Sequence, residues 1–174
     1  MYIGHVGVAL GAKRLRASVG LLPLLLATYA PDWLDTGLCV AGSYDPRSML
    51  SHSMPAVLFL ALFGFACYAL ATRDWTGALI ISGVIASHML LDWITGYKPT
   101  WPGGPMIGLR WYEHPLLDFA TEGLVIAVGA LLYARTLPTR QRPWRDVSIM
   151  ISALLVLQLT IDVAHLLMQT LPKC

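Results

Sequence analysis

The stretch GALIISGVIASHMLLDWITG, residues 77–96, decides the fold of this chain. It approaches the ~20 apolar residues that a helix needs to cross the hydrocarbon core of a bilayer. It nevertheless contains His88 and Asp92, whose four-residue spacing places both side chains on one face of a helix. Ionisable groups at such a depth are costly and need a compensating partner. The stretch therefore predicts a membrane span that carries a polar site.

The composition of the whole chain agrees with a membrane protein. Its 174 residues suit a single domain, 1–174, and 56% of them are hydrophobic while only 13% are charged, with a mean hydropathy of +0.62. A soluble domain carries about 25% charged residues. The net charge of +2 and the absence of a basic run argue against a nucleic-acid partner. The three cysteines lie far apart and lack a metal-binding spacing.

Four segments approach the length of a membrane span, namely 53–72, 77–95, 115–134 and 147–171. A fifth, 18–30, is short and contains Pro23, so it is either a short span or a broken helix packed against others. Residues 3–15 are predicted to form a helix whose small residues permit close packing. We therefore expect an all-α, polytopic transmembrane bundle with about four to five spans and an N-terminal helix, embedded in a lipid bilayer.

The basic residues of the loops predict the orientation, because cytoplasmic loops are enriched in Lys and Arg. Threading the spans alternately gathers eight basic residues on one side of the membrane and four on the other. The loops 31–52 and 96–114 then face outward from a prokaryotic inner membrane. The segment 96–112 is rich in Gly, Pro and aromatic residues, which suits either an interfacial lid or a plain aromatic belt.

Histidines and carboxylates from several segments are predicted to lie at one depth. At ~1.5 Å of rise per residue, most of them fall within about 12 Å of the outer face. Imidazole and carboxylate ligands suit Zn²⁺, with Mn²⁺ or Fe²⁺ as alternatives, and their number is enough for two ions. The candidate metal ligands are His5, Asp32, His52, His88, Asp92, His114 and Asp118.

Other readings of these residues stay open. A single H-x-x-x-D pair is more often a hydrogen-bonded pair that joins helices, and the carboxylates of PDWLD could be solvated. Asp35 and Glu122 are candidate proton acceptors, with an orienting role as the alternative for Glu122. Lys98 and Arg110 are candidates for binding a substrate phosphate. The stripe formed by Gln158, Asp162, His165 and Gln169 is expected to be structural.

These motifs resemble the YdjM-like membrane-bound metal-dependent hydrolases. The resemblance lies in the early His of GHVGVALGA, in PDWLD, in LSHS and in SHMLLDWITGYKPTWP, and it covers residues 3–105. In RSMLSHS, Arg47 takes the place of a His of the family pattern and is a further candidate for substrate binding. The repeated H-x-x-x-D spacing is also similar to that of the zinc phospholipase C and P1 nuclease group, which implies zinc and phosphoester hydrolysis.

The sequence therefore predicts a membrane-embedded hydrolase whose metal-activated water attacks a phosphoester or acyl bond of a lipid-like substrate. The alternative is a metal-ion transporter or metal-sensing membrane protein without hydrolytic activity. Transporters generally hold their ions near the midplane between repeats. Here no repeat is visible and the candidate ligands gather near one face, which favours the enzyme. A scaffold in which the polar residues only join helices is the third reading.

Overall fold

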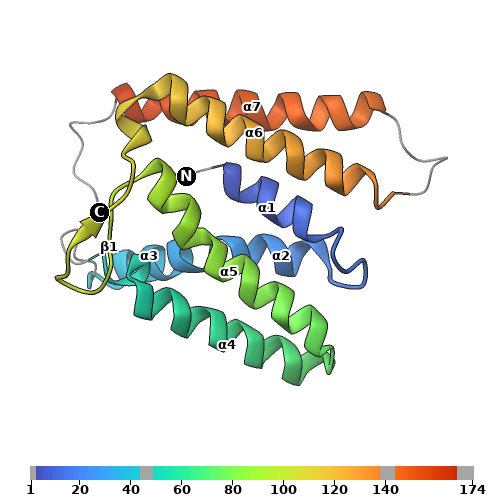
Figure 1. The fold of residues 1–174 in the computed structure, drawn as a ribbon, viewed down its shortest axis with the longest axis horizontal. Coiled ribbons are helices and arrows are strands. Elements are labelled where there is room, and N and C mark those ends of the chain that lie inside the picture. Colours follow the sequence, from blue (N-terminus) through green and yellow to red (C-terminus); the bar gives the residue numbers. More distant parts are fainter. Residues whose placement is uncertain (1–2, 44–48, 138–143, 168–174) are drawn as a thin grey trace.

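The computed structural model describes residues 3–43, 49–137 and 144–167. Within these ranges the chain is all-α, as predicted, with one short hairpin in a loop (Figure 1). The α-helices are α1 Gly4–Ala12, α2 Leu21–Thr28, α3 Ala30–Val40, α4 Met54–Thr72, α5 Trp75–Thr95, α6 Pro115–Ala134 and α7 Trp144–Leu167. The hairpin pairs β1 Lys98–Pro99 with β2 Met106–Ile107, and two 3-10 turns are η1 Leu50–His52 and η2 Trp111–Glu113.

Four of these helices are long and apolar enough to cross a membrane, namely α4, α5, α6 and α7. They coincide with the four predicted spans. Less than two fifths of the most apolar stretch of each is buried inside the protein, so most of their side chains point away from the bundle. A surface of this kind needs an apolar solvent, because lipid replaces water around it. The four spans therefore place the chain in a lipid bilayer.

The segment with Pro23 is a broken helix, and its continuation corrects one expectation. Residues 31–40 were expected in an outward loop, but they form most of α3, which follows α2 with a break at Tyr29. Tyr29 departs from helical geometry with φ −104° and ψ 15°, and Pro31 occupies the first turn of α3. Proline is well tolerated there, since the first N–H groups of a helix have no partner within the helix. Asp32 and Asp35 thus lie on a helix.

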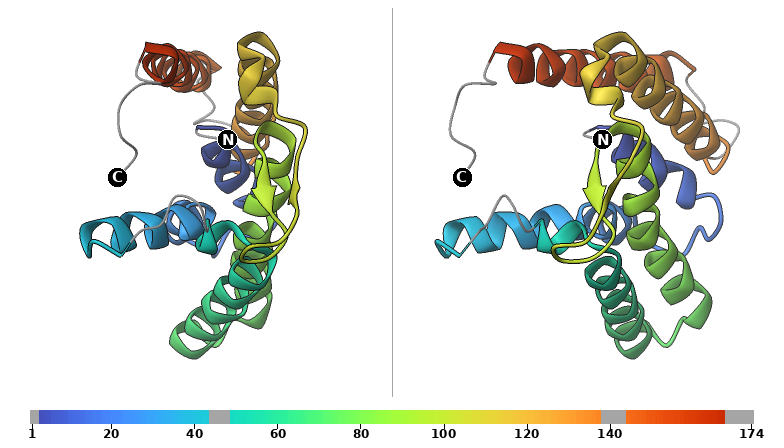
Figure 2. Two further views of the ribbon diagram at one scale, coloured as in Figure 1. Left: turned by 90° about the vertical axis from the view of Figure 1, so that its left-hand side faces the viewer. Right: turned by 60° about the vertical axis from the view of Figure 1, so that its left-hand side comes forward.

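The helices pack as two antiparallel pairs with α1 and α2 in contact with them (Figures 1 and 2). One pair is α4 with α5, the other is α6 with α7, and α1 packs against α6, α2 and α5. α1 approaches α6 so closely that a Cβ on Gly129 would lie on the Gly7 carbonyl oxygen. This contact fixes the depth of α1 and therefore the position of His5, which precedes Gly7 by two residues.

Candidate metal centre

His88 and Asp92 lie on one face of α5 and are both buried, as their spacing predicts. The Nδ1 atom of His88 is 2.8 Å from the carbonyl oxygen of Thr28 in α2. A carbonyl can only accept, so Nδ1 carries the proton and donates it. In the neutral ring, Nε2 then presents a lone pair, which is the arrangement found in metal-binding histidines.

His52 is held in the same way by groups behind its ring. Its Nδ1 atom is 2.8 Å from Ser51 Oγ and 3.2 Å from Asp35 Oδ2. Ser51 gives its own proton to Asp35, so its oxygen accepts from Nδ1–H of His52. Burial alone would lower the pKa of His52, but hydrogen bonds to Asp32 and Asp35 raise it above its ordinary value. The Nε2 atom of His52 points away from Asp35.

The two Nε2 atoms face each other at 3.3 Å. In the neutral form with Nδ1 protonated on both rings, two lone pairs would meet at hydrogen-bond distance. Such a contact is repulsive unless a cation, a proton or a metal ion, lies between the two nitrogens. A proton on His52 Nε2 would instead be donated to Asp32 Oδ1, at 3.2 Å. The two nitrogens therefore face a position that suits a cation, either a proton or a metal ion.

Two carboxylates complete this group. Asp32 Oδ1 lies 3.2 Å from His52 Nε2 and 3.8 Å from His88 Nε2, while Asp92 Oδ2 lies 3.4 and 3.5 Å from the same two atoms. In a tetrahedral zinc site with bonds of about 2.0–2.1 Å, neighbouring ligand atoms are about 3.3 Å apart. The separations between these nitrogen and oxygen atoms therefore suit a small divalent cation.

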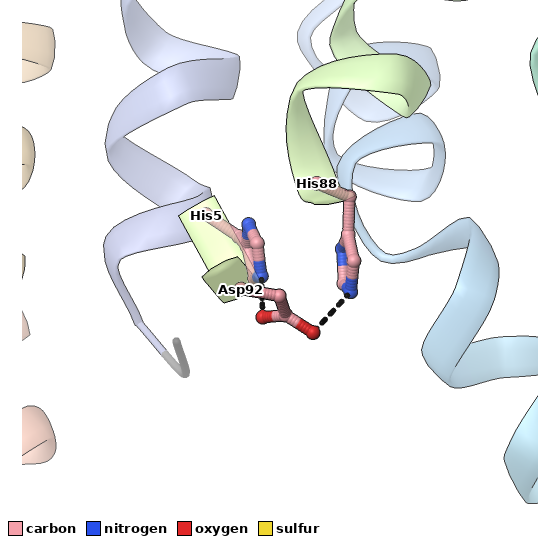
Figure 3. A group of neighbouring side chains, drawn as sticks. All are labelled: His5, His88 and Asp92. Carbon is pink, nitrogen blue, oxygen red and sulfur yellow. Dashed lines mark ion pairs between the residues drawn. The ribbon is translucent and has the colours of Figure 1, made fainter. Parts of the chain in front are cut away.

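His5 of α1 approaches Asp92 from the other side, as Figure 3 shows. Its Nε2 atom lies 3.6 Å from Asp92 Oδ1, and its ring stacks on that of His88 with 4.0 Å between the centroids. The ring is fully buried, yet within the described part of the chain neither of its nitrogens has a hydrogen-bond partner. A buried polar atom without a partner is destabilising. Coordination of a metal by one of these nitrogens would remove that cost.

The five residues form two overlapping groups that could hold a metal. His5, His88 and Asp92 are one, and Asp32, His52 and His88 are the other, each with ligand atoms within 4.8 Å of one another. Asp32 is the most exposed member and lines a cavity of about 340 Å³ together with Tyr29, Trp33 and Thr36. This cavity therefore gives a small molecule access to Asp32.

The candidate catalytic residues take positions behind the ligands. Asp35 contacts Nδ1 of His52 and thus orients the ring. Glu122 of α6 is fully buried, and its Oε2 accepts a 2.8 Å hydrogen bond from the backbone N–H of Gly4. It thereby holds the N-terminus of α1, which carries His5.

The three residues that are candidates for binding a substrate phosphate lie in different surroundings. Lys98 of β1 lies with its Nζ 3.4 Å from Asp92 Oδ2, at the edge of the site. Arg110 is turned to Tyr97, with its guanidinium carbon 4.0 Å from the ring centroid, and to Glu113 at 3.7 Å. Arg47 lies outside the described residues.

The expectation that His114 and Asp118 join the other ligands is corrected, because neither belongs to the two groups. His114 precedes Pro115 and has φ −124° and ψ 82°, so it is outside the helix and the H-x-x-x-D spacing does not align it with Asp118. Its side chain is exposed. Asp118 is buried beside Asp162 of α7, in the polar stripe that also contains Gln158. Gln158 accepts from Ile3 N–H and donates to Asp162, so this part of the stripe connects α7 to the residue before α1. Gln169 and the side chain of His165 lie outside the described part.

Two supporting groups were not identified from the sequence. Ser51 stands within the LSHS motif, so its neighbour His52 was the available signal. The contribution of Thr28 is its backbone carbonyl, together with a hydroxyl that donates to the carbonyl of His5 at 3.0 Å. No side-chain pattern marks a backbone acceptor, because any residue provides one.

Comparison with known proteins identifies a family for this chain. No curated protein and no solved structure matches the chain at a significant level. A protein-family model described as YdjM inner membrane protein matches residues 1–166, which include every described ligand of the two groups. The chain, with its four apolar helices and its buried cluster of histidines and carboxylates, therefore belongs to the YdjM inner membrane protein family.

Proposed function

We propose that this protein is a membrane-embedded, metal-dependent hydrolase that binds zinc through His5, Asp32, His52, His88 and Asp92. The observation that carries the proposal is the pair of Nε2 atoms of His52 and His88, which face each other at 3.3 Å with both Nδ1 atoms engaged elsewhere. Three carboxylates and one lysine surround these rings, so the local charge is negative and favours a divalent cation. Two overlapping groups leave room for one or two ions.

When bound, the metal would supply a Lewis acid and lower the pKa of a coordinated water towards neutrality. The chain's own residues perform the other tasks. Asp35 and the Thr28 carbonyl hold the two imidazoles in the tautomer that offers Nε2. Asp32 turns Oδ1 to the two Nε2 atoms and also lines the cavity, so its other oxygen is the candidate acceptor of a proton from water. Lys98, at 3.4 Å from Asp92, is positioned to bind an anionic substrate oxygen.

A lipid-like phosphoester or acyl ester is the substrate class that fits these features. The ligands lie towards one end of α5, at residues 88 and 92 of a span that runs from Trp75 to Thr95. At about 1.5 Å per residue, these two positions lie roughly 10 and 5 Å from the Thr95 end, on the side of the helix midpoint nearer that membrane face. A transporter or metal sensor, the alternative, is expected to hold its ion near the midplane. The distribution of basic residues supports a site on the outer side of the membrane.

The proposal is tested by metal content and hydrolysis on the purified protein. We expect about one or two equivalents of zinc per chain, with manganese and iron measured in the same samples. The His88→Ala variant should neither bind metal nor hydrolyse phosphoester or acyl-ester lipid probes, because the His88 ring belongs to both groups of candidate metal ligands. His114→Ala is the matched control, since His114 is exposed and outside both groups, and it should keep both.

Two outcomes would refute the proposal. Wild-type protein without stoichiometric metal would remove its basis, as would a His88→Ala variant that unfolds while its metal content stays unchanged. Metal without hydrolysis of any probe, combined with metal uptake into proteoliposomes, would establish the transporter instead.

A further inference from the structure

An apolar groove runs along the protein between α1, α5 and α6. Its volume is about 720 Å³, within the range of sites that bind small molecules. Its walls are almost entirely hydrophobic, and several of the side chains along it, including Leu15, Leu79 and Leu124, are exposed on the outer surface of the bundle. In a membrane-spanning bundle such a groove is open to lipid. We call it the α1–α5–α6 groove.

One end of this groove lies next to the metal centre. Gly7 and Ser87 line it, and they are two residues from His5 and one residue from His88. The other end is lined by Leu15, Thr76 and Leu132, near the opposite ends of the same helices. Along α5 the groove extends from Thr76 to Ser87, eleven residues or about 16 Å. That is about half of the ~30 Å hydrocarbon core. It is the half on the Trp75 side, so the groove runs from the candidate metal centre away from the membrane face nearest the candidate ligands.

The glycines along the groove have different roles. Gly7 and Gly129 are required by packing, since a Cβ on either would collide with backbone of the facing helix. Gly83 of α5 is different, because a Cβ there would meet nothing within 4 Å. Glycine in the middle of a helix is unfavourable, and no contact in the structure explains it at this position. Because Gly83 has no side chain, nothing fills the groove at this point, about halfway along α5.

We propose that the α1–α5–α6 groove binds one acyl chain of a membrane lipid, with the lipid's ester or phosphate at the metal centre. The groove is lined by apolar side chains, is about 16 Å long and has one end beside the candidate ligands, which suits an acyl chain whose ester lies at that end. The position of the headgroup rests on the proposed function, whereas the acyl-chain site rests on the groove alone. A second copy of the chain is the rival occupant. Gly7 and Gly129 contact each other within one chain, so these two glycines are not available for association with a second copy.

Photo-crosslinking in nanodiscs tests the inference without an activity assay. The probe is a phosphatidylcholine with a diazirine on one acyl chain, and crosslinked residues are mapped by mass spectrometry. We expect crosslinks at Leu79 and Val128, which line the groove, at several times the yield per residue found on the lipid-facing surface of α4. Gly83→Leu should reduce them several-fold by filling the groove. Ala66→Leu adds the same side chain to an exposed position of α4 and should leave the yield unchanged.

Folding and the metal are monitored separately. Each variant is checked by its melting temperature, and Val128→Phe fills the groove from the opposite wall should Gly83→Leu fail to fold. Equal yields on the groove and on α4, or groove crosslinks that persist in both folded variants, would overturn the inference. A dimer in native mass spectrometry that Gly83→Leu dissociates would also overturn it. Groove crosslinks in a wild-type protein without metal would support the acyl-chain site while refuting the proposed hydrolase.

Discussion

The Nε2 atoms of His52 and His88 lie 3.3 Å apart although 36 residues of chain separate them. Each ring is fixed from behind by a different element, His88 by the Thr28 carbonyl of α2 and His52 by Asp35 of α3 together with Ser51. Supporting hydrogen bonds of this kind set the tautomer and the orientation of metal-binding histidines. The broken helix α2–α3 therefore aims both imidazoles at one point, and this has consequences that can be measured.

The first prediction separates an orienting role of Asp35 from a catalytic one. Asp35→Ala should weaken zinc affinity about 10- to 100-fold, as is usual when the partner of a metal-bound histidine is removed. Asp35→Asn should lose less zinc affinity than Asp35→Ala, because the amide oxygen of Asn can still accept a hydrogen bond from Nδ1–H of His52. Zinc affinity is measured by competition with a chromogenic chelator. Asp146→Ala, at an exposed carboxylate, is the control. Unchanged zinc affinity in both Asp35 variants together with lost hydrolysis would instead make Asp35 the proton acceptor.

The second prediction concerns pH and the cap of α5. Asp74 Oδ1 accepts from Gly77 N–H at 3.0 Å, and Oδ2 lies 3.1 Å from Arg16 Nε. These interactions, the hydrogen bond first, lower the pKa of Asp74 below its ordinary value. A carboxyl with a depressed pKa in the folded state contributes stability above its unfolded pKa of about 3.9, and that stability is lost as pH falls through the folded pKa.

Asp74→Ala should therefore lower the melting temperature at about pH 7, and the difference from wild type should shrink below about pH 4. Tryptophan fluorescence in detergent follows the unfolding. Asp146→Ala should show no comparable difference, because the pair that Asp146 forms with Arg145 is highly exposed. A gap between Asp74→Ala and wild type that stays constant down to about pH 3 would contradict the argument.

The third prediction uses two glycines of the spans. Gly129→Ala should destabilise the protein by about 1–3 kcal/mol or more, the usual effect of overpacking, because its Cβ meets the backbone oxygen of Gly7. The displacement of α1 should also move His5 and reduce bound zinc. Gly83→Ala, which meets nothing within 4 Å, should leave stability equal or higher. Thermal unfolding and metal content are measured on both variants. If Gly129→Ala and Gly83→Ala have the same stability and bind the same amount of zinc, the packing of α1 against α6 does not position His5.

The fourth prediction concerns orientation, which the excess of basic residues predicts. With all native cysteines replaced by serine, Pro102→Cys in the loop between β1 and β2 should react with an impermeant maleimide on intact cells. Arg135→Cys, at the end of α6 opposite Pro115, should react only after the membrane is opened. Both positions are exposed. The reverse pattern would move the metal centre to the cytoplasmic side while leaving its ligands unchanged.

The sequence by itself determined the spans and the pair on α5. The length and apolarity of a helix are local properties, so 53–72, 77–95 and 115–134 correspond to α4, α5 and α6 within two residues at each end. His88 and Asp92 share a face because the helical period fixes it. The same spacing was misleading at His114 and Asp118. The helix α6 begins at Pro115, so His114 lies outside it and does not share a helix face with Asp118.

Only the tertiary structure decided which residues from different helices meet. The sequence does not define the position of His5, because that position depends on how closely α1 approaches α6, and the contact between Gly7 and Gly129 sets that distance. Asp35 became the partner of His52, and a backbone carbonyl the partner of His88, through the break at Tyr29 that aims α3. A one-dimensional pattern specifies which side of each helix is polar. The axial position and rotation of one helix against another follow from packing between residues far apart in the chain, and the candidate metal centre depends on that position and rotation.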